Sequence, residues 1–119
     1  MKVSSLSFPK VRRLTHRSEY ERVKRVGVTQ RGKLMILNVM PMEDPGPWRV
    51  GFVTSGRIGG AVVRNRVRRR LREIVRRHQH ELRQDFWLVI VPRHEAATAS
   101  YEMLEDEWLR LARRASILL

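Results

Sequence analysis

The chain has 119 residues, of which 42% are hydrophobic and 31% charged, a composition that predicts one folded domain with one core. Lys and Arg number 25 against 12 Asp and Glu, and the formal net charge of +13 favours a polyanionic partner, either nucleic acid or an anionic membrane. The absence of cysteine excludes disulfides and Cys-ligated zinc sites, and the longest apolar run, Phe86–Val91, is too short to span a membrane. We therefore expect a cytoplasmic protein.

The N-terminal part predicts a basic arm followed by a short helix. Residues 1–16 are polar and basic and include a proline, which is typical of an extended arm. Ser18 stands three residues before Glu21, the spacing of a capping box, and Gly27 has the position of a residue that ends a helix. The helix between them would carry Tyr20 on its apolar face.

Two apolar, β-rich segments follow, residues 33–40 and 48–55, separated by the turn-rich segment 41–47. Their spacing predicts a hairpin with a long loop. Residues 86–92 form a further strand that is apolar on both faces, and residues 100–115 a closing amphipathic helix with a serine N-cap. Together with the helix described next, the residues alone predict the order helix, strand, strand, helix, strand, helix, an α+β fold with a small sheet.

The segment "RNRVRRRLREIVRR" (64–77) lies in a long helix predicted over residues 61–82, and it contains eight arginines and one acid, Glu73. One side of this helix is apolar and consists of Val63, Val67, Leu71, Ile74, Val75, His78 and Leu82. The opposite side consists of Asn65, Arg69, Arg72 and Arg76. Like charges one turn apart repel by a few tenths of a kcal/mol, so we expect an anionic partner to stabilise this face rather than solvent alone.

RNA is the polyanion that the sequence favours. No Trp or Phe on the arginine helix could anchor it in a membrane, and Asn65 is its single amide, which favours phosphate contact over reading of duplex DNA. A second basic patch in the N-terminal part includes the aromatic residues Phe8 and Tyr20, and rings beside cations are typical of single-stranded RNA sites. The alternative that Tyr20 only packs in the core remains open. The preference for Arg over Lys suits phosphate but could also reflect genomic base composition.

No catalytic or metal-binding residues are predicted. The four histidines His16, His78, His80 and His94 do not share a helical face, and the acidic residues 102–107 do not converge on one point. No nucleotide-binding loop or nucleophile motif is present.

Several motifs are similar to those of one family. The central one is "RIGGAVVRNRVRRRLRE" (57–73), supported by "RLTHRSEYERV" (13–23), "RVGFVTS" (49–55) and "LVIVPR" (88–93). The matching positions of the central motif are Arg57, Ala61, Val62, Arg64, Asn65, Arg68, Arg69 and Arg72. In these residues and in their order the chain resembles the protein subunit of bacterial ribonuclease P.

The resemblance implies a fold and a function. The fold would be a two-layer α+β sandwich with the order αβββαβα, a mixed sheet, and a left-handed crossover around the arginine helix, where chirality alone predicts a right-handed one. The RNA subunit would perform the Mg²⁺-dependent removal of the 5′ leader from precursor tRNA. The protein would be its cofactor, with Mg²⁺ held mainly by RNA, one protein per RNA subunit, and no membrane partner.

The resemblance also implies two sets of site residues. The catalytic RNA would contact Arg57, Arg64, Asn65, Arg66, Arg68, Arg69 and Arg72. The precursor leader would contact Arg13, His16, Tyr20, Lys24 and Asn38. Lys24 stands where the family typically has an aromatic residue, and Gly56 where it commonly has a lysine. A ribosomal RNA-binding protein and a self-sufficient nuclease are the alternative functions.

Overall fold

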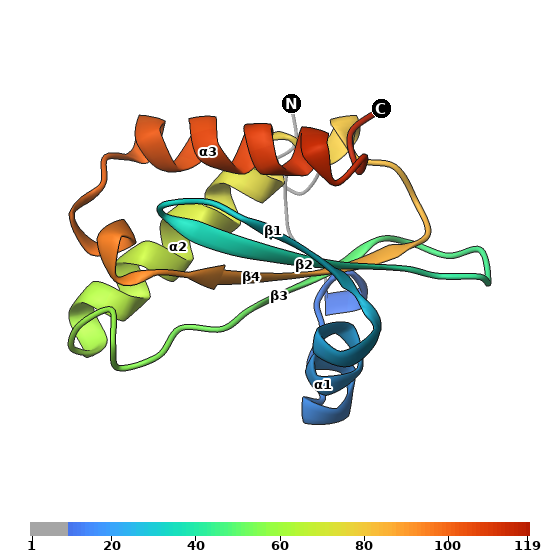
Figure 1. The fold of residues 1–119 in the computed structure, drawn as a ribbon, viewed down its shortest axis with the longest axis horizontal. Helices are drawn as coiled ribbons and strands as arrows, with labels where there is room; N and C mark the ends of the chain where they lie inside the picture. Colours follow the sequence, from blue (N-terminus) through green and yellow to red (C-terminus); the bar gives the residue numbers. More distant parts are fainter. Residues whose placement is uncertain (1–9) are drawn as a thin grey trace.

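The structure is a computed structural model that describes residues 10–119 (Figure 1). Its centre is a sheet with the strand order β1-β2-β4-β3. The strands are β1 (Val28–Arg31), β2 (Met35–Pro41), β3 (Arg49–Phe52) and β4 (Phe86–Pro92), and the helices are α1 (Arg17–Val26), α2 (Ala61–Arg77) and α3 (Tyr101–Arg114). The α+β class, the αβββαβα order and the mixed sheet are confirmed.

The predicted hairpin between residues 33–40 and 48–55 is wrong, because β4 lies between β2 and β3. All seven β4 residues are apolar in side chain and five are buried, so a central position covers both faces of the strand. The hairpin partner of β2 is instead β1, with Val28 opposite Val39 and Arg31 opposite Ile36. The residues of β1 are largely polar and exposed, as an edge strand allows, and only the family resemblance had implied this strand.

Strands β3 and β4 are parallel neighbours, so the chain must cross over between them, and α2 forms this crossover. The predicted apolar side of α2 is confirmed by the burial of Val67, Leu71, Ile74 and Val75. The helix ends at Arg77, and a 3-10 turn follows over Gln79–Glu81, so the predicted end near residue 82 was too late.

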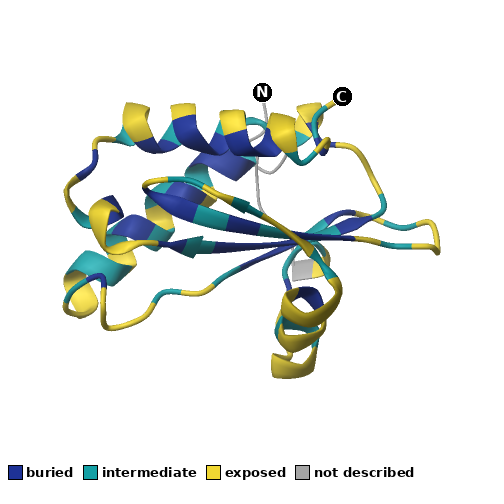
Figure 2. Cartoon of the chain, in the orientation of Figure 1, coloured by how far each residue is buried: buried dark blue, intermediate teal, exposed yellow. Residues whose placement is uncertain are grey.

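The helices cover the two faces of the sheet unequally (Figures 1 and 2). α2 and α3 lie over one face and enclose the larger core, which includes Trp48, Leu88 and Trp108. α1 lies on the other face, where a smaller cluster contains Leu14, Val23, Met40 and Val89. This arrangement adds α1 as a partial layer to the expected two-layer sandwich. Within residues 10–119, no helix has the length and apolar character needed to cross a bilayer.

The N-terminal segment packs against β3 as far as the structure describes it. Residues 1–9 of the predicted arm, including Phe8, lie outside the described residues. Lys10–Arg12 form a 3-10 turn, Arg13 pairs with Val50, and the buried Leu14 donates its N–H to the Val50 carbonyl at 2.9 Å. Residues 13 and 14 thus extend the sheet beside β3 instead of forming a separate arm.

The start of α1 differs from the predicted capping box of Ser18 and Glu21. His16 is the N-cap, and the carboxylate of Glu19 accepts the backbone N–H groups of Thr15 and His16, both at 2.9 Å. The capping box is therefore shifted by two residues from the predicted one. The predicted end of the helix at Gly27 is confirmed.

A buried carboxylate connects α3 to the β1–β2 turn. Glu107 is 4% exposed, and it accepts backbone N–H groups from Lys33, Leu34 and Met35 at 3.2, 2.6 and 2.9 Å. Gly32 leaves the space for this carboxylate, since a Cβ there would lie 2.5 Å from its Oε2 atom. The predicted cap of α3 is confirmed, because the Ser100 hydroxyl accepts the Met103 N–H at 3.1 Å.

His78 joins the end of α2 to α3 through two carboxylates. Its Nδ1 atom lies 2.6 Å from Glu81 and its Nε2 atom 2.7 Å from Glu105. Burial alone would lower the pKa of His78, but the hydrogen bonds and charges of the two glutamates outweigh burial and raise it. The protonated ring can donate to both carboxylates at once, which the neutral ring cannot.

This geometry predicts a pH-dependent contribution to stability. Because the pKa of His78 is raised in the folded state, its contribution is full below its unfolded pKa of about 6.5 and is lost as the pH rises through the higher folded pKa. At pH 6, His78→Gln should lower the free energy of unfolding by about 1–2 kcal/mol, less than two full charged hydrogen bonds because Glu81 is half exposed. Urea unfolding of both proteins should show this difference shrinking toward pH 9. The exposed His80→Gln serves as control, and a difference that stays constant with pH would contradict the assignment.

Candidate nucleic-acid interface

The solvent side of α2 carries a compact basic surface. Asn65, Arg68, Arg69 and Arg72 line a hollow of about 380 Å³, and Arg68 donates a hydrogen bond to the Asn65 side-chain oxygen. No acidic side chain lines this hollow. Four of the seven residues predicted to bind the catalytic RNA therefore lie together on one helical face. Arg57 is exposed just before α2, and Arg64 lies near Gly56.

Other arginines of α2 are engaged within the protein. Arg66 and Arg70 each donate to a backbone carbonyl at 3.2 Å, those of Ala97 and Ala99 in the segment before α3. Arg76 pairs with Glu73, and Arg77 lies 3.7 Å from Glu105. Arg66 was predicted to bind RNA, but one of its N–H groups is engaged in a hydrogen bond within the protein.

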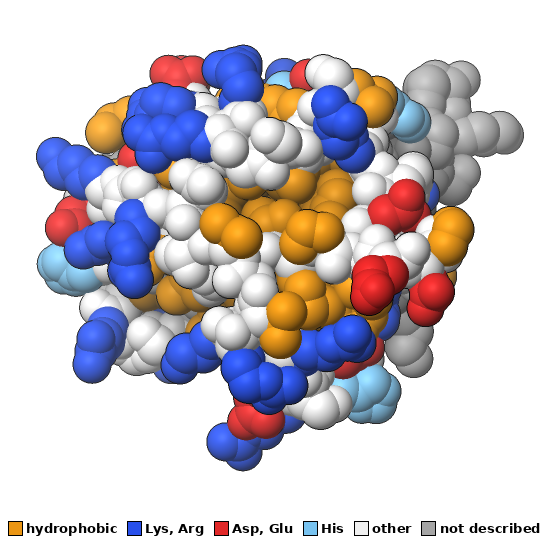
Figure 3. All heavy atoms as spheres, turned by 45° about the vertical axis from the view of Figure 1, so that its right-hand side comes forward, with side chains coloured by type: hydrophobic (Ala, Val, Ile, Leu, Met, Phe, Trp, Pro, Cys, Tyr) orange, Lys and Arg blue, Asp and Glu red, His pale blue; other side chains and the backbone are white. Residues whose placement is uncertain are grey.

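A cleft of about 520 Å³ lies between α1 and the uncovered part of the sheet. It contains three of the residues predicted to bind the leader, Tyr20, Lys24 and Asn38. The sequence reasoning missed the other lining residues, which are Glu21, Thr29, Arg31, Ile36, Val53, Val89 and Val91. Two of them belong to β1, whose polar residues gave no strand signal. Figure 3 shows Lys and Arg side chains around an exposed apolar area on one side of the molecule.

Tyr20 is both a packing residue of α1 and a wall of the cleft. Its hydroxyl donates to the Leu14 carbonyl at 3.1 Å, and its ring lies directly against Gly51 of β3. A Cβ at position 51 would lie 2.4 Å from the ring, so only glycine allows this approach. Burial, with the charge of Glu19 adding to it, raises the pKa of Tyr20. The alternative that Tyr20 packs in the core is thus confirmed, while its contact with RNA stays a prediction.

Arg49 of β3 fixes the N-terminal end of α1. One of its nitrogens lies 2.8 Å from the Glu19 carboxylate, another donates to the Arg13 carbonyl at 2.8 Å, and the guanidinium lies 5.2 Å from the Trp87 ring centre. Burial alone would raise the pKa of Glu19, but the N–H groups of His16 and Thr15 and the charge of Arg49 outweigh it and lower the pKa. His16 itself is exposed and does not line the cleft.

A smaller hollow, of about 230 Å³, shares lining residues with both the cleft and the basic face of α2. Tyr20 lines both this hollow and the cleft, and Arg13, Arg68 and Arg72 line it as well. Burial and the charges of Arg13 and Arg68 lower the pKa of Arg72. The Arg13 Nε atom is buried without a hydrogen-bond partner among the described residues, and none of the three arginines forms an ion pair there. An anion in this hollow would relieve their mutual repulsion.

The described residues do not fit a protein-held Mg²⁺ site. Over residues 10–119, no three His, Asp or Glu side chains gather in a group that could hold a metal ion. Glu73, the one acid of α2, is paired with Arg76. The chemistry that this surface offers is the binding of phosphate groups by guanidinium groups.

Comparison with known proteins decides between the possible families. The family model described as Ribonuclease P matches residues 8–116. The chain belongs to the ribonuclease P protein family. It is 33% identical to the ribonuclease P protein component of Symbiobacterium thermophilum over 109 residues, covering 92% of this chain and 95% of that one. Identity to the corresponding protein of Dehalococcoides mccartyi is 40% over 106 residues, covering 89% and 86%.

Solved structures of ribonuclease P proteins share the fold. The Staphylococcus aureus protein matches with a TM-score of 0.85 at 17% identity, covering 92% of this chain and 100% of that one. The Thermotoga maritima protein matches with a TM-score of 0.77 at 23% identity, covering 86% and 96%. The chain is thus a subunit of ribonuclease P and assists the RNA in removing the 5′ leader of precursor tRNA. The ribosomal and self-sufficient nuclease alternatives are set aside.

The contact between Gly51 and Tyr20 predicts the effect of one methyl group. Gly51→Ala should push the Tyr20 ring off β3, lower the free energy of unfolding by about 1–3 kcal/mol through overpacking, and weaken binding of a single-stranded leader RNA. Thermal unfolding and fluorescence anisotropy with a labelled leader measure the two effects. Gly46→Ala is the matched control, since a Cβ there meets nothing within 4 Å. Equal behaviour of the two variants would contradict this role of Gly51.

Proposed function

We propose that this subunit holds two RNAs at once, with α2 on the catalytic RNA and the cleft beside α1 on the precursor leader. The observation that carries the proposal is the hollow lined by Arg13, Arg68, Arg72 and Tyr20, which shares Tyr20 with the cleft and Arg68 and Arg72 with the basic face of α2. A leader strand in the cleft would therefore lie next to RNA bound on α2. Charge supports the same arrangement, because +13 spread over a small domain attracts and orients RNA.

On α2, the proposed contacts to the catalytic RNA are with its phosphates. Arg64, Asn65, Arg68, Arg69 and Arg72 lie on or beside the basic face, with Arg57 just before the helix. Guanidinium groups bind phosphate oxygens in pairs and carry no base preference in doing so. Arg66 keeps donors beyond its bond to Ala97 and contributes less in this proposal.

In the cleft, the proposed leader contacts combine stacking and charge. The rings and aliphatic groups of Tyr20, Val89 and Val91 can receive bases, while Lys24 and Arg31 are cations that can pair with phosphates. Asn38 accepts a 2.8 Å hydrogen bond from the Thr29 hydroxyl through its oxygen, so its amide N–H groups are available to a base edge. Arg13 binds at the junction hollow, and His16 contacts the leader only beyond the cleft.

As the family implies, we assign Mg²⁺ mainly to the RNA partner. When bound there, it supplies an activated water and stabilises the leaving oxygen. The arginines of α2 and the cleft neutralise phosphates that would otherwise repel one another at low Mg²⁺. One protein per RNA subunit and a cytoplasmic location complete the proposal, the latter in keeping with the lack of cysteine.

Reconstitution tests the proposed function. The purified protein should stimulate a bacterial ribonuclease P RNA to cleave precursor tRNA at the mature 5′ end at low Mg²⁺, whereas the protein alone should cleave nothing. Stimulation that is equal for precursors with and without a leader would contradict the two-RNA arrangement.

The basic face of α2 predicts a loss in assembly. Arg68→Ala combined with Arg69→Ala removes two phosphate contacts, so the slope of log affinity for the RNA subunit against log salt should fall by about 1.4–1.8. Filter binding over a range of salt concentrations measures this slope. Arg113→Ala combined with Arg114→Ala is the matched control, because both side chains are exposed at the end of α3. An unchanged slope in the α2 variant would refute the assignment.

The cleft predicts a loss specific to the leader. Tyr20→Ala removes a stacking surface, and affinity for precursor tRNA should fall by about 1–3 kcal/mol while affinity for mature tRNA stays the same. Tyr20→Phe keeps the ring and loses only the hydroxyl bond to Leu14, so it should retain most of the affinity. Holoenzyme binding to both tRNAs provides the comparison. Equal losses for precursor and mature tRNA would overturn the cleft assignment.

A further inference from the structure

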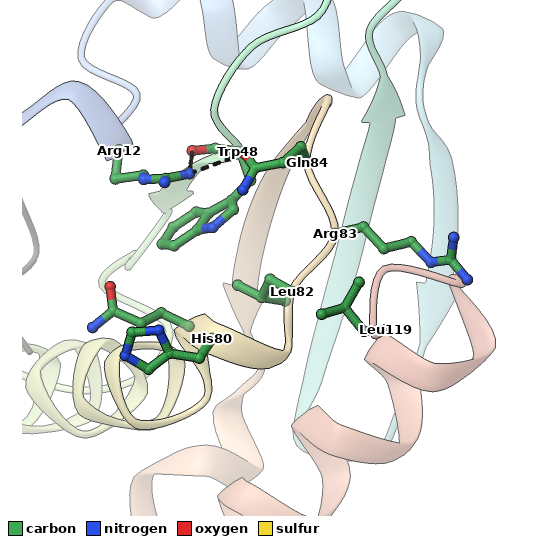
Figure 4. A pocket seen from close by; sticks show the side chains of 8 residues that line it. Arg12, Trp48, His80, Leu82, Arg83, Gln84 and Leu119 are labelled. Atoms are coloured by element: carbon green, nitrogen blue, oxygen red, sulfur yellow. Dashed lines mark hydrogen bonds between the residues drawn. The ribbon is translucent and has the colours of Figure 1, made fainter.

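A further hollow, of about 350 Å³, lies just beyond the C-terminal end of α2 and has no part in the function proposed above (Figure 4). Trp48 and Leu82 in its wall belong to the core on the α2 and α3 side of the sheet, away from the cleft. Its volume falls within the range of sites for small ligands, about 300–1,000 Å³. Its walls are Arg12, Trp48, Gln79, His80, Leu82, Arg83, Gln84 and Leu119.

The hollow carries positive charge without a compensating acid. The Arg12 guanidinium lies 4.5 Å from the Trp48 ring centre, and its contacts to the Trp48 carbonyl and the Gln84 side chain are long, at 3.5 and 3.4 Å. Arg83 donates its Nε–H to the Leu118 carbonyl and keeps its other donors. Within residues 10–119 neither arginine forms an ion pair, and burial lowers the pKa of Arg12. Arg12 is thus available to an anion in the hollow, whereas Figure 4 shows the Arg83 side chain directed away from Arg12 and Trp48.

The remaining wall contains a polar atom that needs an acceptor. The Gln79 Nε2 atom is buried and has no hydrogen-bond partner among the described residues. Such atoms are rare because an unpaired buried donor is costly. Leu82 and Leu119 add apolar surface to the hollow (Figure 4). A phosphate ion would use only Arg12, whereas a nucleotide would also place a base against the leucines with its edge toward the Gln79 amide.

The position of the hollow indicates which nucleotide could reach it. Asn65, Arg69 and Arg72 follow one another at helical spacing on the basic face of α2, and Gln79 begins the 3-10 turn directly after that helix ends. We propose that the hollow binds one nucleotide of the RNA that lies along α2. The source of the nucleotide rests on the proposed function, but its binding can be measured on the protein alone.

Adenosine monophosphate is the probe for the free protein. Backbone and side-chain NMR signals of residues 79–84, with the indole N–H of Trp48, should shift on titration, and affinity should exceed that for inorganic phosphate at least fivefold. Adenosine without phosphate should bind more weakly than the monophosphate. Gln79→Met and Arg12→Gln should each weaken binding at least threefold, while Arg25→Gln, an exposed arginine on α1, should not. Equal binding of phosphate and the monophosphate, or shifts confined to the cleft or α2, would overturn the proposal.

The holoenzyme tests the source of the nucleotide. If it belongs to the RNA along α2, Arg12→Gln and Gln79→Met should weaken assembly with the RNA subunit about three- to tenfold and leave the affinity for the precursor leader unchanged. Because Arg12 is partly exposed, its variant should fold even if the Gln79 variant does not. Unchanged assembly with intact nucleotide binding would refute the RNA source. Failure of the wild-type protein to stimulate precursor cleavage would instead refute the proposed function, whether or not adenosine monophosphate binds to the free protein.

Discussion

The parallel pairing of β3 with β4 is the constraint on which the proposed RNA-binding surfaces depend. Parallel neighbours cannot be joined by a tight turn, so the chain between them must return across the sheet, and α2 makes that return. To pack there, α2 buries Val67, Leu71, Ile74 and Val75, which leaves its arginines on the opposite side. β3 is then the edge strand of the sheet, and residues 13 and 14 pair along it. This pairing is what places Arg13 beside Arg68 and Arg72.

The sequence predicts best the features that depend on neighbouring residues. The buried side of α2 follows from helical spacing, and the start of α3 from the Ser100 cap. The position of β4 between β2 and β3 depends on pairing between residues far apart, and hydrophobic patterns do not record which strand is the partner. β1 was missed because an edge strand has few buried side chains. The Glu107 carboxylate looked like one of several helical acids, since its partners are backbone groups more than seventy residues away.

In the candidate site, too, the features that depend on neighbouring residues were predicted and those that depend on distant residues were not. Spacing alone put Asn65, Arg69 and Arg72 on one face, and the structure keeps them together. The positive charges in the sequence do not show which arginines face solvent and which bond within the protein. Arg66 and Arg70 donate to backbone carbonyls of another segment. The cleft residues come from α1 and three strands, so only the family resemblance could have grouped Tyr20, Lys24 and Asn38 from the sequence.

The buried carboxylate of Glu107 has a consequence for how the cleft can vary between related chains. It holds the β1–β2 turn through backbone N–H groups, which every residue except proline supplies. Apart from the space at Gly32, the attachment therefore does not depend on which side chains β1 carries. Thr29 and Arg31, which form one rim of the cleft, are free to be exchanged without loosening the strand that presents them. Evolution can thus alter the side chains that line the cleft while the backbone attachment beneath them stays the same.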